Sequence, residues 1–226
     1  YSSVMIDASY EPFDRNVKIT RKIVRKAHLK RIKVEAELGV LSGIEDDIDI
    51  LEKDALFTRP DQAFDFVEQT RCDSLAVAVG TSHGAYKFAG NSGLKLDILE
   101  KIQTKLPGFP IVLHGASAVP VDEVQRINHA GGRISGSAKG TDPDQLLQAI
   151  KLGVCKINIA TDARLLWTRV HREFFLNEPE KFDPIIPGDQ YINEFASFVE
   201  SKCELLGSAG KSSLYKKWRN YNEERR

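Results

Sequence analysis

The sequence predicts an α/β protein built as a (β/α)8 TIM barrel, of which about the last five βα units lie within this chain. Five runs rich in β-branched and aliphatic residues begin at residues 3, 32, 74, 110 and 154, far enough apart for a helix and two loops between them. Each run is followed by a polar loop and then by a helical pattern. This repeat is typical of parallel strands joined by right-handed crossovers. The predicted strands are residues 3–7, 32–38, 74–80, 110–115 and 154–159.

Polar side chains gather where these strands end, at Asp7, Glu37, His83, His114 and Asn158. The carboxyl ends of barrel strands meet on one face, where barrel active sites lie. A doubly wound sheet would need a glycine-rich phosphate turn after its first strand, and residues 7–10, Asp-Ala-Ser-Tyr, are not such a turn. The barrel is therefore favoured. Since a barrel has about 250 residues, we expect roughly three further units, on the order of 100 residues, before residue 1.

The helices are predicted from apolar spacing and from their boundary residues. Apolar residues at helical spacing over residues 17–27, with lysine and arginine on the other face, predict an amphipathic crossover helix. Pro60 and Pro143 are typical of helix starts, and Gly131 and Gly153 are typical of helix ends. Further helices are expected at residues 60–69, 94–105, 121–131, 144–152 and 164–177.

The composition excludes several classes of protein. The 226 residues include 42% hydrophobic and 28% charged residues, as in an ordinary globular protein. No apolar run approaches the ~20 residues of a membrane helix, so we expect no membrane association. The charges of the 32 basic and 32 acidic residues cancel, so no net positive charge attracts nucleic acid to the protein as a whole. Three cysteines without close spacing favour a reducing, cytoplasmic location.

Charge is nevertheless segregated along the chain. Residues 18–33 contain eight lysines and arginines and no acid, whereas residues 35–54 contain eight acids and one lysine. We interpret these segments as a solvated helix face and a solvated loop. Residues 1–206 are assigned to the barrel domain and residues 207–226 to a basic, aromatic tail. RNA contact by this tail is less favoured than a peripheral helix that packs on the barrel or on a partner subunit.

Four of the residues at strand ends form a candidate metal site: Asp7, Glu37, His83 and His114. A catalytic zinc site takes about three protein ligands, often histidines, and leaves one position open for substrate. Both histidines end an apolar strand and precede a glycine, which favours ligation over a structural role. Gly84 and Gly115 also allow backbone N–H groups to approach an anion, and Ser117 and residues 158–161 add donors. A phosphate pocket is expected there.

The motifs as a whole resemble the class II, zinc-dependent fructose-bisphosphate aldolases from residue 1 to about residue 211. Several long motifs in the family's order carry this resemblance. They are Ser-Ser-Val-Met-Ile-Asp-Ala-Ser at 2–9, Glu-Ala-Glu-Leu-Gly at 35–39, Gly-Ile-Glu-Asp at 43–46, Gly-Thr-Ser-His-Gly-Ala-Tyr-Lys at 80–87, Leu-His-Gly-Ala-Ser-Ala-Val-Pro at 113–120 and Lys-Ile-Asn-Ile-Ala-Thr-Asp at 156–162.

The resemblance implies a role for each motif residue. His83 and His114 would bind the catalytic zinc, while Asp7 and Glu37 would be ligands of a second or alternative zinc position. Glu45, on the loop after the second strand, would move the proton at the carbon next to the carbonyl. The dihydroxyacetone-phosphate part of the substrate would contact Gly84, Lys87, Gly115, Ala116, Ser117, Asn158, Ile159, Ala160 and Thr161. The implied reaction is reversible cleavage of fructose 1,6-bisphosphate to dihydroxyacetone phosphate and glyceraldehyde 3-phosphate, a step of glycolysis and gluconeogenesis.

Two departures from the family pattern leave alternatives open. The family's third zinc histidine and its adjacent aspartate come from an earlier strand, and this sequence contains no Asp-His pair. A non-catalytic barrel scaffold therefore remains an alternative. Ile185 stands where the family usually has an arginine for the far phosphate, so tagatose bisphosphate or another ketose phosphate is an alternative substrate. The resemblance also implies that the protein forms a homodimer or homotetramer. Whether a monovalent cation binds beside the phosphate is left open.

Overall fold

The computed structural model contains a five-stranded parallel sheet in the order β1-β2-β5-β6-β7. It describes residues 1–39, 43–45, 48–50, 57–80, 93–135 and 140–214. Each βα unit places its strand next to the strand of the preceding unit, as in a barrel wall, whereas a doubly wound sheet reverses direction. The α/β prediction is confirmed. The strands are β1 (Ser3–Ile6), β2 (Lys33–Leu38), β5 (Ser74–Val77), β6 (Ile111–Leu113) and β7 (Val154–Ile157).

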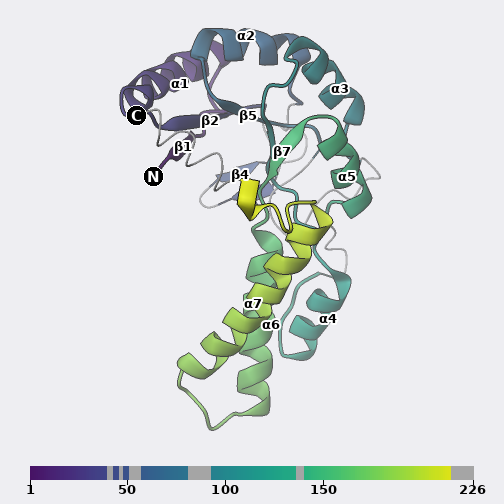
Figure 1. Cartoon of the computed structure of the whole chain (residues 1–226). Helices are drawn as coiled ribbons and strands as arrows, with labels where there is room; N and C mark the ends of the chain where they lie inside the picture. The colour runs from purple at the N-terminus through teal and green to yellow at the C-terminus, as the bar shows by residue number, and fades with distance from the viewer. Residues whose placement is uncertain (40–42, 46–47, 51–56, 81–92, 136–139, 215–226) are drawn as a thin grey trace. The chain divides into compact units, whose positions relative to one another are not determined.

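Helices alternate with these strands as the sequence predicts. Figure 1 shows α1, α2, α3 and α5 as an arc outside the strands. Pro60 begins α2, and the side chain of Asp142 caps α5 by accepting a hydrogen bond from the N–H of Asp144. Gly153, with φ of 95°, turns the chain after α5 into β7. The helices of this part are α1 (Phe13–His28), α2 (Pro60–Thr70), α3 (Leu96–Lys105), α4 (Val121–His129) and α5 (Pro143–Lys151).

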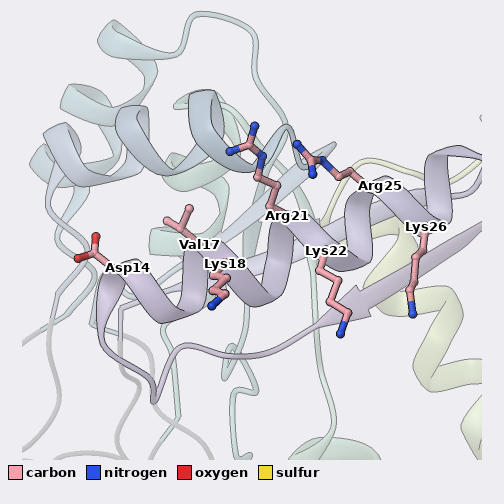
Figure 2. Close-up of a pocket in the computed structure, with 7 residues that line it drawn as sticks. All are labelled: Asp14, Val17, Lys18, Arg21, Lys22, Arg25 and Lys26. Atoms are coloured by element: carbon pink, nitrogen blue, oxygen red, sulfur yellow. The ribbon is translucent and has the colours of Figure 1, made fainter.

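Helix α1 separates apolar and basic side chains. Val17 and Val24 are buried, and so is the short side chain of Ala27. Five cations, Asp14 and Val17 line an open pocket of about 570 Å³ along this helix (Figure 2). The cations are Lys18, Arg21, Lys22, Arg25 and Lys26. These basic side chains form the polar face of the predicted amphipathic helix. They lie outside the sheet and not at the strand ends.

The structure adds two elements that the sequence analysis did not assign. A two-stranded antiparallel hairpin joins β3 (Gly43–Glu45) to β4 (Ile48–Ile50), where a loop was expected. Helix α7 (Ile185–Leu205) follows α6 (Thr161–Asn177). Pro187 and Gly188 argue against a helix by propensity, but both lie in the first turn of α7, where proline is tolerated.

The chain divides into two compact units, residues 1–165 and 166–226. In the second unit, the ring of Tyr191 stacks on that of Phe195 with centroids 5.3 Å apart. The buried guanidinium of Arg169 pairs with Glu173 and Glu194. Thus α6 and α7 are joined by a buried ion pair. In the described part of the chain, no helix is long and apolar enough to cross a membrane.

Candidate functional site

His114 lies directly after β6, at the carboxyl end of that strand. The three residues of β6 have no exposed surface, and His114 is 4% exposed, so the strand carries the imidazole into the interior. Gly115 follows at φ of 63°, a conformation that glycine adopts without steric cost. The chain therefore turns sharply at this point, as expected for a strand end that carries a functional side chain.

Two carboxylates of β2 contact the imidazole of His114. Glu35 and Glu37 are two residues apart, so their side chains share one face of the strand. Oε1 of Glu35 lies 2.9 Å from Nε2 of His114, and Oε2 of Glu37 lies 2.8 Å from Nδ1. All three side chains are almost completely buried. The structure therefore brings together two of the four predicted metal ligands, Glu37 and His114.

Lys156 of β7 completes this cluster. Its Nζ atom lies 2.7 Å from Oε2 of Glu35. Strands β2 and β7 are separated by β5 and β6, which in a flat sheet would place them about 14 Å apart at roughly 4.8 Å per strand. A lysine and a glutamate that meet across this span indicate that the sheet curls toward the face they share. This face is the concave side of the partial barrel.

His114 and Glu35 shift each other's pKa in opposite directions. Burial by itself would lower the pKa of His114, but hydrogen bonds to Glu35 and Glu37 and their negative charges raise it to about 9. Burial likewise would raise the pKa of Glu35, and hydrogen bonds from His114 and Lys156 outweigh it and hold that pKa below its usual value. The raised pKa of His114 and the lowered pKa of Glu35 therefore favour an imidazolium in contact with a carboxylate at neutral pH.

The loop after β6 is tied to the start of α6. Oδ1 and Oδ2 of Asp162 accept hydrogen bonds from the backbone N–H groups of Val119 and Ala118, at 2.8 and 3.0 Å. The hydroxyl of Ser117 accepts a 3.1 Å hydrogen bond from the N–H of Thr161. Ser117 and Asp162 are buried, as is Ala116. The two segments predicted to bind phosphate are thus held side by side.

Residues 158–160 connect β7 to α6 on the same edge of the sheet. The N–H of Asn158 donates a 2.8 Å hydrogen bond to the carbonyl of Leu113, one residue before His114. Ile159 is partly exposed and Ala160 is exposed. This segment therefore lies beside the strand end that carries the imidazole, as the barrel prediction requires.

Of the remaining predicted site residues, the structure describes the side chain of Asp7 and leaves out four others. Asp7 follows the last residue of β1, is exposed, and accepts a 2.8 Å hydrogen bond from the N–H of Ser9. Since Ile6 pairs with Ala36, Asp7 ends the strand next to the one that carries Glu37. The other four lie outside what the structure describes: His83, Gly84, Lys87 and the side chain of Glu45, whose backbone ends β3.

Three residues of the site were given no role from the sequence: Glu35, Lys156 and Asp162. All three belong to motifs that the sequence analysis quoted, but their contacts run between segments far apart in the chain. Side chains alternate between the two faces of a strand, so the sequence could have predicted that Glu35 lies on the same face as Glu37. No comparable signal predicts that Lys156 reaches Glu35, since that contact depends on the curl of the sheet.

The residues present fit a divalent metal that accepts nitrogen and oxygen ligands. A buried imidazole in contact with a buried carboxylate supplies two such donors, and zinc accepts both types. Within the described ranges, no group of three or more histidine, cysteine, aspartate or glutamate side chains could hold a metal ion. His83, the other predicted histidine ligand, lies outside those ranges.

Comparisons with known proteins show the family of the chain. The family model of class-II fructose-bisphosphate aldolases matches residues 1–211. Fructose-bisphosphate aldolases of Thermus caldophilus and Giardia intestinalis are 46% and 45% identical to the chain, over 94% and 96% of its length. The chain spans 69% and 66% of these two relatives, about two thirds of their length.

Solved structures show the same fold. The YdjI aldolase of Escherichia coli K12 matches 93% of the chain with a TM-score of 0.67 and 28% identity, and the chain covers 62% of it. A crystal structure from Coccidioides immitis, at 24% identity, matches 94% of the chain with a TM-score of 0.73, and the chain covers 65% of it. These neighbours have the TIM-barrel fold. On this evidence the chain belongs to the class-II fructose-bisphosphate aldolase family.

Proposed function

We propose that the protein is a zinc-dependent lyase that reversibly cleaves fructose 1,6-bisphosphate to dihydroxyacetone phosphate and glyceraldehyde 3-phosphate. The observation that carries this proposal is the contact of 2.8 Å between His114 and Glu37, both buried at strand ends of the sheet. Family membership supports the reaction class. Residues 1–206 then form the last five-eighths of a barrel domain, and residues 207–226 a tail.

His83 and His114 would hold the catalytic zinc, and Asp7 and Glu37 would be ligands of a second or alternative zinc position; of these four residues only His83 lies outside the described ranges. Bound zinc supplies a Lewis acid that stabilises the negative charge left on the ketose fragment when the bond between its third and fourth carbons breaks. No lysine Schiff base is then needed.

The phosphate of the ketose fragment is proposed to bind between the loop after β6 and the start of α6. Gly115 to Ser117 and Asn158 to Thr161 are the proposed contacts, and hydrogen bonds of Asp162 and Ser117 hold the two segments together. An anchored phosphate holds the reacting carbons in one position, which lowers the entropic part of the barrier. Gly84 and Lys87 are proposed to contact the same fragment, and Glu45 to move the proton at the carbon next to the carbonyl.

The test is cleavage of fructose 1,6-bisphosphate by the encoded protein before chelation, after chelation, and after zinc is restored. Activity that disappears with the chelator and returns with zinc supports the proposal. A protein that binds zinc but does not cleave this substrate contradicts the substrate assignment. A protein with neither zinc nor activity contradicts the enzyme assignment and favours a non-catalytic barrel.

A second ketose bisphosphate is the alternative substrate, and Ile185 is the observation that favours it. This residue begins α7 and its aliphatic side chain is exposed, so it offers no bidentate contact to a phosphate. Comparison of kcat/KM for fructose and tagatose 1,6-bisphosphates distinguishes the two assignments. Restoring the arginine with Ile185→Arg lowers KM for the preferred bisphosphate if this position faces the far phosphate.

We also propose that the protein is a cytoplasmic homodimer or homotetramer. In residues 166–226 several large apolar side chains are exposed, including Phe182, Ile185 and Ile192. Exposed apolar surface of this kind marks protein interfaces. The three cysteines are free, which agrees with a reducing compartment. Light scattering on the purified protein measures the oligomeric state, and a monomeric mass contradicts this part of the proposal.

A further inference from the structure

The five cations that line the open pocket along α1 have no carboxylate partner within the part of the chain that the structure describes. They are Lys18, Arg21, Lys22, Arg25 and Lys26. All five are exposed, and residues 18–33 contain no acid. Asp14 also lines this pocket, but it forms no ion pair with them in the described ranges. These five side chains, called here the basic face of α1, therefore carry a charge that the described chain leaves unneutralised.

Helix α3 shows the contrast, because both of its cations are paired with acids. Nζ of Lys101 lies 3.0 Å from Oδ2 of Asp97, and Nζ of Lys105 lies 2.7 Å from Oδ1 of Asp61 on α2. On α1 the spacing of four residues instead brings cation next to cation, and like charges at this spacing repel each other. A bound polyanion would relieve this repulsion.

Arg21 and Arg25 extend the basic face into a second open pocket, of about 450 Å³, which is lined by both α1 and α2. The end of α2 contributes Gln69 and Arg71, whose N–H groups are further donors. The two pockets share Arg21 and Arg25, so they form one continuous surface for an anion.

The basic face has the length and charge density of a stretch of nucleic-acid duplex. Figure 2 shows Arg21 and Arg25 extending to one side of α1, and Lys22 and Lys26 to the other. Lys26 follows Lys18 by eight positions, or about 12 Å of helix axis. A duplex carries one phosphate per roughly 1.7 Å of its axis, which gives about seven over this length. Five cations are therefore of the same order as the phosphates they would meet.

We propose that the basic face of α1 binds the phosphate backbone of double-stranded nucleic acid without preference for sequence. Lysine and arginine neutralise phosphates, and the release of counterions from the duplex drives such binding. Single strands are commonly held by aromatic rings on which their bases stack. Among the described residues, no aromatic side chain lines either pocket, which favours a duplex. The proposal does not depend on the proposed zinc site, because the basic face lies outside the sheet and not at the strand ends.

An anionic membrane and an acidic protein fit this surface less well. A helix on a membrane inserts its apolar face, but Val17 and Val24 of α1 are buried in the core. Protein interfaces are anchored by large apolar or aromatic side chains, and Leu29 is the one exposed apolar residue lining the described pockets. The zero net charge of the chain does not oppose the proposal, since salt screens charges beyond about 8 Å.

The experiment measures fluorescence anisotropy of labelled RNA and DNA duplexes of mixed sequence, titrated with the full encoded protein at a series of salt concentrations. Both duplexes are expected to bind, with a dissociation constant on the order of 1–100 µM at physiological salt. For the DNA duplex, the plot of log affinity against log salt should have a slope of about −4.5 if all five cations contact phosphates, at roughly −0.9 for each contact.

Paired substitutions test whether α1 carries the binding. Arg21→Gln with Arg25→Gln keeps good helix formers and should reduce the slope to about −2.7, because two contacts are lost. Arg21→Lys with Arg25→Lys should keep the slope of the wild type, since the number of charges is unchanged. The matched control is Lys151→Gln with Lys181→Gln, which removes two exposed cations elsewhere and should leave the slope unchanged.

The outcomes separate this proposal from the proposed aldolase activity. Absence of duplex binding at about 50 mM salt, or a wild-type slope in the Arg21→Gln, Arg25→Gln protein, overturns it. Tighter binding of single-stranded oligouridine, of phosphatidylserine vesicles or of polyglutamate also overturns it and identifies a different partner. Aldol cleavage by the arginine variant should equal that of the wild type, so failure of either proposal leaves the other standing.

Discussion

Oδ1 of Asp162 accepts a 2.8 Å hydrogen bond from the backbone N–H of Val119 and so joins the first turn of α6 to the loop after β6. Val119 has φ of 50°, a left-handed conformation that β-branched residues rarely adopt and that costs about 1–2 kcal/mol. Its side chain is nonetheless buried with Val124, Ile127 and Leu165. The carboxylate and the apolar cluster together hold this strained turn where the phosphate site is proposed.

Replacement of this carboxylate should loosen the turn. Asp162→Ala removes two hydrogen bonds to a charged acceptor, so the free energy of unfolding should fall by about 2–4 kcal/mol. KM for the bisphosphate should rise because the loop and α6 lose their fixed spacing. Urea unfolding and steady-state kinetics measure both effects. The control is Asp65→Ala on the exposed face of α2, expected within about 0.5 kcal/mol of wild type; equal effects at both sites would contradict the clamp.

Gly140 should not tolerate a side chain. A Cβ atom built there would lie 2.2–2.3 Å from the carbonyl groups of Ser117 and Ala118, which are backbone atoms and cannot move aside cheaply. Gly140→Ala should therefore destabilise the protein by about 1–3 kcal/mol and raise KM. Gly188→Ala in α7 meets no atom within 4 Å and should be neutral or slightly stabilising. A Gly140→Ala protein with wild-type stability and KM would show that this approach is unimportant.

His114→Ala should cost stability as well as activity. The change removes the cation between the buried carboxylates Glu35 and Glu37, and loss of one partner from a buried ion pair costs about 3–5 kcal/mol. Bound zinc and aldol cleavage should be lost together. Thermal unfolding, metal analysis and the cleavage assay test this result. His129→Ala, at an exposed position of α4, is the matched control; full activity of the His114 variant would remove the basis of the proposed site.

Asp73 should give the protein a defined acid sensitivity. Burial would raise its pKa, but hydrogen bonds from Lys33, His28 and the N–H of Val34, with the charge of Lys33, hold that pKa below its usual value. A carboxyl whose folded pKa is depressed stabilises the fold above the unfolded pKa of about 3.9, and this contribution is lost as the pH falls through the folded pKa.

Asp73→Asn tests this dependence. At pH 7 the variant should be about 1 kcal/mol less stable than wild type, and the difference should shrink as the pH falls below about 4. Unfolding in urea at a series of pH values measures it. A difference that stays constant down to pH 3 would mean that ionisation of Asp73 does not stabilise the fold.

Much of the fold could be predicted because it follows from local patterns. The apolar runs predicted all five parallel strands, and Pro60 and the Asp142–Pro143 pair predicted two helix starts, since these residues act within one turn of the chain. The β3–β4 hairpin was missed because its strands have three residues each, too few for a period to be read. Helix α7 was missed because Pro187 and Gly188 hide its first turn.

The sequence alone determined the residue types of the site: carboxylates and histidines at strand ends, and glycines and a serine beside them. These follow from the chain order, because parallel strands bring their carboxyl ends to one edge. The tertiary structure decided which of them meet. Lys156 contacts Glu35, and Asp162 contacts Val119, because the sheet curls and the loop after β6 folds onto α6. Such contacts depend on the packing of distant segments, which no local pattern of residues encodes.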